Sequence, residues 1–171
     1  MESSTAPTRR GGFGSVPIYW HQMSEAFEVR WGEYLISTDP AQLDLGVIHS
    51  FLTKSYWAKG VTEDVVARSI EHSICFGAYK DGKQVAFTRV VTDRATFAFL
   101  ADVFVIESER GSGLGKLLVE AALSHPELAS LRRWLLATDD AHGLYERFKF
   151  APLRKPEPWM EIHEPYVEAS S

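Results

Sequence analysis

The sequence of 171 residues has one cysteine, Cys75, and no apolar run near the roughly 20 residues that a transmembrane helix needs. A single cysteine excludes an intrachain disulfide and leaves a cysteine-based zinc site without its other ligands. The 6 histidines are scattered without a His-x3-His pair, so we expect no metal site. The net charge is −5, which argues against nucleic acid as the main partner. We expect a cytoplasmic protein with neither a membrane nor a nucleic-acid partner.

The length favours one domain with tails. Residues 1–15 are rich in Ser, Thr, Gly, Pro and Arg and lack periodicity, so we interpret them as a flexible N-terminal tail. Residues 16–32 form an N-terminal extension with several aromatic side chains, and the pattern assigns no structure to it. The domain itself is expected over residues 33–166, followed by a C-terminal tail over residues 167–171.

Hydrophobic periodicity and turn residues predict a mixed order of strands and helices. An Asp-Gly pair between two β-rich runs predicts a hairpin, and acidic or capping residues at 44 and 62 open two helices. The predicted strands are 34–36, 74–79, 84–91, 97–105, 134–137 and 159–162, and the predicted helices begin near 44, 62, 114 and 141. The fold class is α/β (α+β), with helices on the faces of a mixed, mostly antiparallel sheet.

The most informative segment is the corner that follows the strand ending at Val105. Gly111, Gly113 and Gly115 open an amphipathic helix, and glycines leave the backbone amides unobstructed. The first amides of a helix have no partner in the helix and carry a partial positive charge, so the corner suits a phosphate. Arg110 adds positive charge. The simpler alternative is a tight strand-to-helix turn without a ligand.

Spacing excludes two well-known phosphate loops. A Walker loop needs four residues between its first glycine and a Gly-Lys pair, but three lie between Gly111 and Gly115. The dinucleotide fingerprint needs Gly-x-Gly-x-x-Gly, which is also absent here. The remaining pattern is Arg-x-x-Gly-x-Gly, formed by Arg110, Gly113 and Gly115 after a strand.

This pattern resembles the coenzyme-A-binding motif of the GNAT superfamily of N-acetyltransferases. Downstream, the segment from Leu144 to Phe150 is similar to the family's Leu-Tyr-x-x-x-Gly-Phe segment. The element order also matches from about Tyr34 to Ile162. The resemblance implies six to seven strands that splay at the central pair, with about four helices. Lys149 stands where the family usually has glycine, so we expect the end of that helix to differ in shape.

The resemblance also implies acetyl-CoA as co-substrate, without a metal. Its pyrophosphate would lie on the corner, its pantetheine arm along the preceding strand, and further contacts would come from the following strand and helix. The residues implied in this binding are Val103, Phe104, Val105, Arg110, Gly111, Ser112, Gly113, Leu114, Gly115, Lys116, Thr138 and Phe148.

Four further residues are candidates for catalysis or acceptor binding. The resemblance gives Tyr145 the role of general acid toward the departing thiolate, whereas its spacing alone also fits a core aromatic. Asp102 lies inside an apolar strand, where it is either a hydrogen-bonded structural carboxylate or a base with a raised pKa. Tyr56 and Trp57 either cover apolar core or wall an acceptor site, since aromatic faces hold cationic amines.

The activity implied is direct transfer of an acetyl group, in a ternary complex, to a primary amine of a small molecule or peptide. Two alternatives stay open: a non-catalytic acyl-CoA sensor, and a protein-interaction domain that docks a partner or a second copy as a homodimer. Cys75 is interpreted as a small buried hydrophobe. Glu107 and Glu109 are interpreted as solvated turn residues, and His142 as a cap or surface residue. No motif identifies the acceptor or marks the general base.

Overall fold

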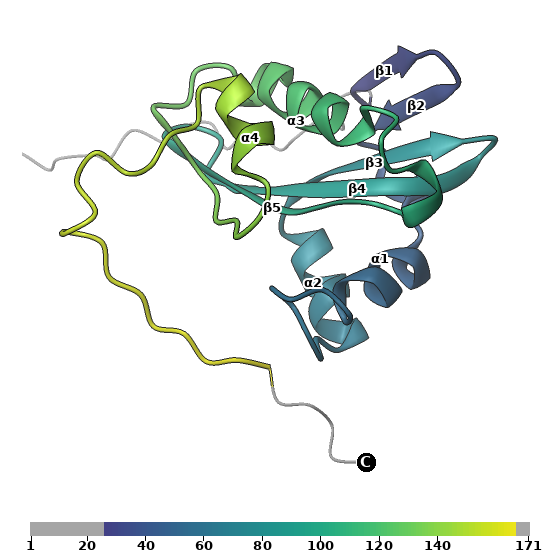
Figure 1. Ribbon diagram of the computed structural model, residues 1–171. Helices are drawn as coiled ribbons and strands as arrows, with labels where there is room; N and C mark the ends of the chain where they lie inside the picture. Colours follow the sequence, from purple (N-terminus) through teal and green to yellow (C-terminus); the bar gives the residue numbers. More distant parts are fainter. Residues whose placement is uncertain (1–25, 167–171) are drawn as a thin grey trace, which may run out of the picture.

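The computed structural model describes residues 26–166, which fold around a six-stranded sheet (Figure 1). The strands are β1 (Glu28–Trp31), β2 (Tyr34–Ser37), β3 (Ile74–Lys80), β4 (Lys83–Thr92), β5 (Phe97–Val105) and β6 (Arg133–Leu135). The helices are α1 (Leu45–Leu52), α2 (Glu63–Glu71), α3 (Leu114–Ser124) and α4 (His142–Tyr145), and a 3-10 turn over Glu146–Phe148 continues α4. Further 3-10 turns span Pro40–Gln42, Glu107–Glu109 and Pro126–Leu128.

Local sequence signals form the elements where they are expected. Asp81 and Gly82 both take positive φ angles, 50° and 74°, as the predicted two-residue hairpin between β3 and β4 requires. The Asp44 side chain accepts a hydrogen bond of 3.0 Å from the Val47 amide and caps α1. Both predictions are therefore confirmed.

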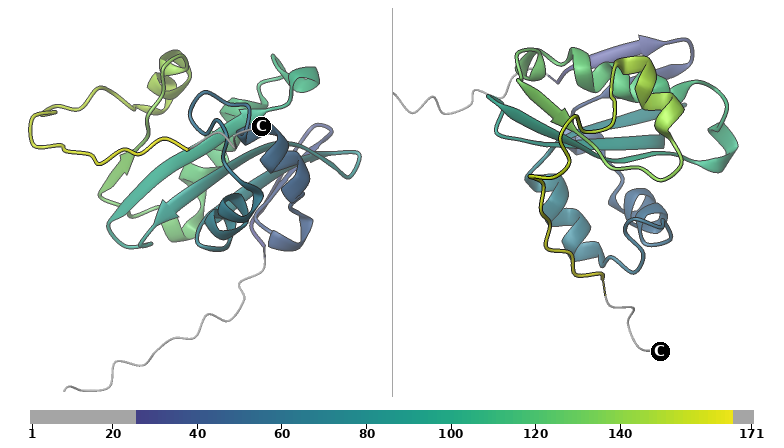
Figure 2. Two further views of the ribbon diagram at one scale, coloured as in Figure 1. Left: turned by 90° about the horizontal axis from the view of Figure 1, so that it is seen from below. Right: turned by 60° about the vertical axis from the view of Figure 1, so that its left-hand side comes forward.

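The sheet separates two helical layers. Its strands follow the chain order from β1 to β6, antiparallel except for the parallel pair of β5 and β6. Alternate side chains face opposite layers: Cys75, Phe87 and Phe104 pack toward α1 and α2, while Phe76 and Leu100 pack toward α3. Figures 1 and 2 show α1 and α2 on one face and α3 and α4 on the other. The predicted fold class is confirmed.

β5 and β6 pair along only part of their length. The register runs from Phe97 opposite Arg133 to Phe99 opposite Leu135 and stops there, although β5 continues to Val105. From Leu100 onward, the edge of β5 that faces β6 therefore has no strand partner among residues 26–166. This is the splay that the sequence resemblance implies, but the diverging pair lies at the end of the six-stranded sheet and not at its centre.

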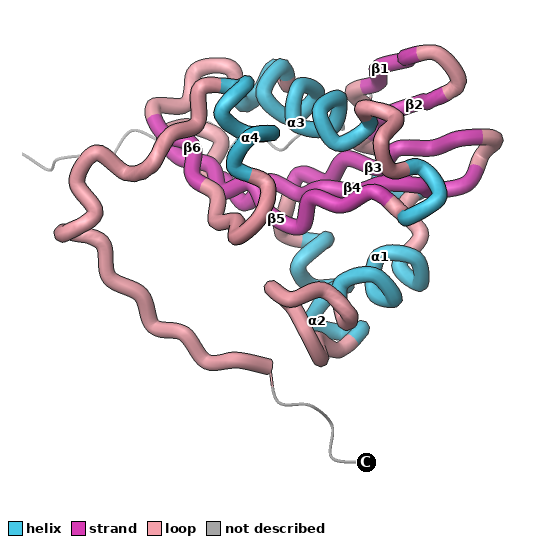
Figure 3. The backbone as a smooth tube through the Cα atoms, viewed as in Figure 1, coloured by secondary structure: helices cyan, strands magenta, loops and turns pink. Residues whose placement is uncertain are grey.

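The C-terminal segment differs from expectation. Residues 159–162 form no strand, and residues 151–166 are exposed and run away from the sheet (Figures 1 and 3). Pro152, Pro156, Pro158 and Pro165 interrupt the segment, and a proline cannot donate to a strand ladder. The local pattern of a strand is present, but the segment has no neighbouring strand among residues 26–166.

β1 lies inside the N-terminal extension that the sequence left unassigned, and it pairs with β2 over Glu28–Trp31. The predicted tails, residues 1–15 and 167–171, fall outside the described residues, as does the first part of the extension. Within residues 26–166, none of the helices has the length and apolar character needed to cross a bilayer.

Candidate functional site

The loop before α3 has a backbone conformation that favours glycine at two positions. After β5 and the 3-10 turn, Gly111 and Gly113 take φ angles of 81° and 90°, and Gly113 caps the start of α3. The Gly113, Gly115 and Lys116 amides donate to no acceptor among residues 26–166. Leu114 is fully buried and anchors the helix, so this start of α3 presents free amides in a fixed place.

A network of hydrogen bonds and ion pairs fixes this loop to the neighbouring strands. The Tyr34 hydroxyl donates a 2.6 Å hydrogen bond to Glu109, and Lys80 approaches the same carboxylate at 3.4 Å. Lys80 also pairs with Glu33 at 2.8 Å. The Tyr34 hydrogen bond and the Lys80 charge lower the pKa of Glu109. The interpretation of Glu109 as a solvated turn residue is therefore wrong: its side chain is only 16% exposed and ties the loop to β2 and β3.

A cavity of about 1050 Å³ opens beside the unpaired part of β5. Its wall combines the end of β5 and the following turn with α1, the loop after α1 and the loop before α4. The lining includes Asp44, Val47, Phe51, Lys54, Tyr56, Trp57, Val103, Phe104, Val105, Glu107, Arg110 and Asp140. The cavity thus brings the predicted pantetheine strand, Arg110 and both predicted acceptor residues together.

Aromatic side chains form one side of this cavity. Phe51 stacks on Phe104 with 4.0 Å between ring centroids, and Tyr56 meets Trp57 edge-on at 4.9 Å. The Tyr56 hydroxyl accepts a 3.0 Å hydrogen bond from the Asp139 amide. Tyr56 therefore bridges the loop after α1 and the loop before α4.

Asp102 stands at an irregular point of β5. The register between β4 and β5 shifts between Phe87 and Arg89, and Asp102 takes a left-handed φ of 56°. Its carboxylate pairs with Arg89 and accepts a 3.2 Å hydrogen bond from the Trp57 indole. The side chain is 9% exposed. Asp102 is thus a hydrogen-bonded carboxylate that positions Trp57, and its role as a base stays a prediction.

Tyr145 is buried on α4 and packs in the same core as α3. Burial, together with the nearby Tyr56 and Asp140, raises the pKa of its hydroxyl to about 12. Tyr145 therefore stays a phenol at neutral pH and keeps a proton to donate. Asp140, two residues before α4, lines the cavity, whereas Tyr145 itself is not among the lining residues.

Other predicted residues have structural positions near the site. The Thr138 hydroxyl accepts a 3.1 Å hydrogen bond from the Ala141 amide at the start of α4. The Ser112 hydroxyl donates to the Glu109 carbonyl at 2.7 Å, inside the loop. Lys116 is exposed on the first turn of α3. Phe148 lies apart from the cavity, in the wall of a second hollow beside β6.

The end of α4 keeps the shape that glycine would give it. Lys149 takes the left-handed conformation, with φ 68° and ψ 16°, so our expectation of a differently shaped helix end is wrong. Cys75 is buried, and burial raises its thiol pKa to about 12, which confirms the interpretation of a small buried hydrophobe. No group of three or more potential metal ligands occurs within residues 26–166.

The arrangement can bind an extended anionic carrier and hold an amine beside it. Free amides at the start of α3 suit a phosphate, the unpaired edge of β5 suits an added extended chain, and aromatic faces suit a cation. The sequence missed three side chains in or near this site: Glu109, Arg89 and Asp140. The partners of Glu109 and Arg89 lie 75 and 13 residues away, so a local pattern does not mark these two, and Asp140 belongs to no recognisable motif.

Comparison with known proteins agrees with this geometry. The profile of the acetyltransferase (GNAT) family matches residues 20–150. A putative acetyltransferase of Gibberella zeae is 33% identical over 135 residues, which are 65% of this chain and 75% of that protein. A putative GNAT-family acetyltransferase from Xanthomonas campestris pv. campestris is 46% identical with a TM-score of 0.78. Its match covers 82% of this chain and all of the other.

More distant structures share the fold. A protein from Clostridium acetobutylicum described as a predicted acetyltransferase, solved with acetyl-CoA, is 10% identical with a TM-score of 0.55. The match covers 76% of this chain and 94% of that one. The family match spans the splayed strands, the glycine loop and α4. This chain belongs to the acetyltransferase (GNAT) family and is an acyltransferase.

Proposed function

We propose that the chain is an N-acetyltransferase that moves the acetyl group of acetyl-CoA directly to a primary amine. The observation that carries this proposal is the divergence of β5 and β6 beside the glycine loop. The divergence leaves one edge of β5 free next to free amides and a cavity of about 1050 Å³. The donor would therefore lie along β5 and the acceptor in the cavity, so that the two are adjacent at the end of β5.

The proposed donor site consists mainly of backbone groups, at the start of α3 and along the free edge of β5. The amides of Gly113, Gly115 and Lys116 would hold the pyrophosphate, with Arg110 beside it. The free edge of β5 over Val103–Val105 would hold the pantetheine arm by main-chain hydrogen bonds. The Clostridium acetobutylicum protein of the same fold, solved with acetyl-CoA, supports this choice of donor. When bound, the donor supplies a thioester carbonyl near Val105, where a backbone amide would stabilise developing negative charge.

The acceptor must reach this point as a neutral amine. An unperturbed ammonium has a pKa near 10.4, so a carboxylate or a water held by one must take its proton. Asp102 is one candidate, although its oxygens already accept hydrogen bonds from Arg89 and Trp57. Asp140 is a second candidate, because it lines the cavity and lies close enough to Tyr145 to raise its pKa.

Tyr145 is the proposed general acid. Its raised pKa keeps the hydroxyl protonated until the thiolate departs. Tyr145 does not line the cavity, but Tyr56 and Asp140, which do, are close enough to raise its pKa. Tyr56 and Trp57 line the acceptor side and would present aromatic faces to the ammonium form of the substrate before it loses its proton. The acceptor class that fits is a primary amine on a small molecule or peptide.

A free-thiol release assay with acetyl-CoA across a panel of amines tests the proposal. We expect release that depends on the amine and that falls in Tyr145→Phe but not in Tyr79→Phe. Tyr79 is a matched control because it is also buried, on β3. The same assay with longer acyl-CoA donors decides whether acetyl is preferred. Thiol release that no amine stimulates, with any of these donors, would overturn the proposal.

A further inference from the structure

Trp31 is a large exposed aromatic side chain beside the loop before α3. It is the last residue of β1 and is 47% exposed, although tryptophan is highly buried on average in folded proteins. Its ring atom Cη2 lies 3.8 Å from the position that a Cβ atom on Gly113 would take. Figure 1 shows β1 and β2 beside the start of α3. The indole edge therefore lies against the loop whose free amides would hold the pyrophosphate.

The position of Trp31 is fixed by the hairpin of β1 and β2. A two-residue turn at Gly32 and Glu33 places Trp31 directly opposite Tyr34. The two rings stack with 5.9 Å between their centroids and 15° between their planes. The hydroxyl of the same Tyr34 donates to Glu109 in the loop before α3. Tyr34 thus contacts both the indole and the loop, so the spacing between them is set before any ligand arrives.

One face of the indole is available to a ligand. The Tyr34 ring covers the opposite face, and it is the one ring that stacks on Trp31 among residues 26–166. An open tryptophan face binds flat aromatic groups, and nucleobases stack on such faces without dependence on their sequence. Arg110 and Lys116, both exposed, lie on either side of the glycines and supply positive charge for phosphates. The surroundings of Trp31 therefore suit a base that is attached to phosphates.

We propose that Trp31 binds the nucleobase of the donor, which stacks on the open face of the indole while the pyrophosphate lies on the amides at the start of α3. This inference rests on the proposed function, because it takes acetyl-CoA as the donor. Its consequence is donor specificity: Trp31 favours a thioester that carries a nucleotide over the same thioester on phosphopantetheine alone.

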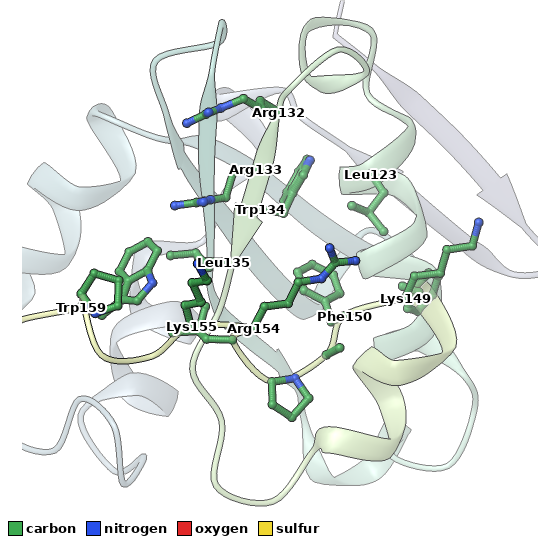
Figure 4. Close-up of a pocket in the computed structure, with 15 residues that line it drawn as sticks. Leu123, Arg132, Arg133, Trp134, Leu135, Lys149, Phe150, Arg154, Lys155 and Trp159 are labelled. Atoms are coloured by element: carbon green, nitrogen blue, oxygen red, sulfur yellow. The ribbon is translucent and has the colours of Figure 1, made fainter.

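Isothermal titration calorimetry with CoA and with 4′-phosphopantetheine, which lacks the nucleotide, tests the inference. Trp31→Ala should weaken CoA binding about tenfold, the size expected for one stacked base, and leave 4′-phosphopantetheine binding unchanged. Trp31→Phe keeps an aromatic face and should retain most of the CoA affinity. Trp159→Ala is the matched control, because Trp159 is also exposed, at 41%, but lies in the hollow beside β6 (Figure 4).

Circular dichroism confirms that each variant folds. Equal losses of affinity for the two ligands would show that Trp31 acts only by supporting the loop, and this result would overturn the inference. A wild type that binds CoA no better than Trp31→Ala does would overturn the inference and leave the proposed function standing. A wild type that binds no CoA would overturn both.

Tryptophan fluorescence detects the stacked base directly. Adenosine 3′,5′-bisphosphate, which carries the nucleotide without the thioester arm, should quench the emission of the wild type and of Trp159→Phe but not that of Trp31→Phe. Pyrophosphate alone should quench none of the three. Quenching that is absent from the wild type, or that persists in Trp31→Phe, would contradict the contact between the base and Trp31.

Discussion

The structure has two hollows of similar volume, one beside the end of β5 and one beside β6. The side chains that line them differ in charge. The cavity beside β5 mixes carboxylates, cations and aromatic faces around a free strand edge, whereas the hollow outside β6 contains cations without a carboxylate. The carboxylates in the cavity beside β5 suit proton transfer, because this step needs a proton acceptor close to the reacting groups. Charge of a single sign suits capture of an oppositely charged segment. The two hollows are therefore alike in volume but differ in the ligands that their walls can bind.

Gly113→Glu, in the loop next to the cavity beside β5, should have the largest effect, which is on acetyl-CoA affinity. A carboxylate about 4 Å from the pyrophosphate costs about 4 kcal/mol at an effective dielectric constant near 20, or about a thousandfold in acetyl-CoA affinity. Isothermal titration calorimetry measures the loss. Gly82→Glu is the matched control, because Gly82 also has a positive φ and open space at its Cβ position but lies in the β3–β4 hairpin. Equal affinities for the two variants would contradict the placement of the pyrophosphate.

Tyr145→Phe should lower kcat by about a hundredfold while KM for acetyl-CoA stays unchanged, since it removes a proton donor and little binding surface. Steady-state kinetics between pH 6 and pH 10 provides both values. Burial raises the pKa of Tyr145 to about 12, so its ionisation should add no descending limb to the wild-type pH profile within this range. A KM that rises with an unchanged kcat would assign Tyr145 to binding instead.

Glu109→Gln should have a smaller effect that depends on pH. The folded-state pKa of Glu109 is lowered, first by the Tyr34 hydrogen bond, so its contribution to stability is present above the unfolded-state pKa and is lost as pH falls through the folded-state pKa. The Tm difference from wild type should therefore be largest at pH 7 and shrink toward pH 3. Glu107→Gln is the control two residues away, on an exposed side chain. A difference that is constant over this range would contradict the role of the ionised carboxylate.

Lys149→Gly, in the wall of the hollow beside β6, should have the smallest effect, which is on Tm. A left-handed backbone costs a side-chain-bearing residue about 1 kcal/mol, so glycine at this helix end should raise Tm by about 2–4 °C. Thermal unfolding followed by circular dichroism measures the change in Tm. Lys155→Gly, in the same hollow but without the left-handed backbone, should give no such gain. A lower Tm for Lys149→Gly would show that contacts of the lysine outweigh the strain.

Sequence rules succeeded where the cause is local. The hairpin at Asp81-Gly82, the cap at Asp44 and the glycine loop all depend on residues a few positions apart, so their patterns were sufficient. The network of Glu109 was missed because its partner Tyr34 lies 75 residues earlier in the chain. Residues 159–162 show the opposite failure: their alternating pattern predicts a strand, but a strand also needs a neighbouring strand to pair with.

Two loops at the cavity beside β5 belong to different helical layers of the molecule. Tyr56 follows α1 on one face of the sheet, Asp139 precedes α4 on the other, and a 3.0 Å hydrogen bond joins them across the end of β5. A single hydrogen bond of this kind contributes about 1 kcal/mol. This free energy is close to thermal energy, so thermal motion can separate the two loops and widen the opening of the cavity.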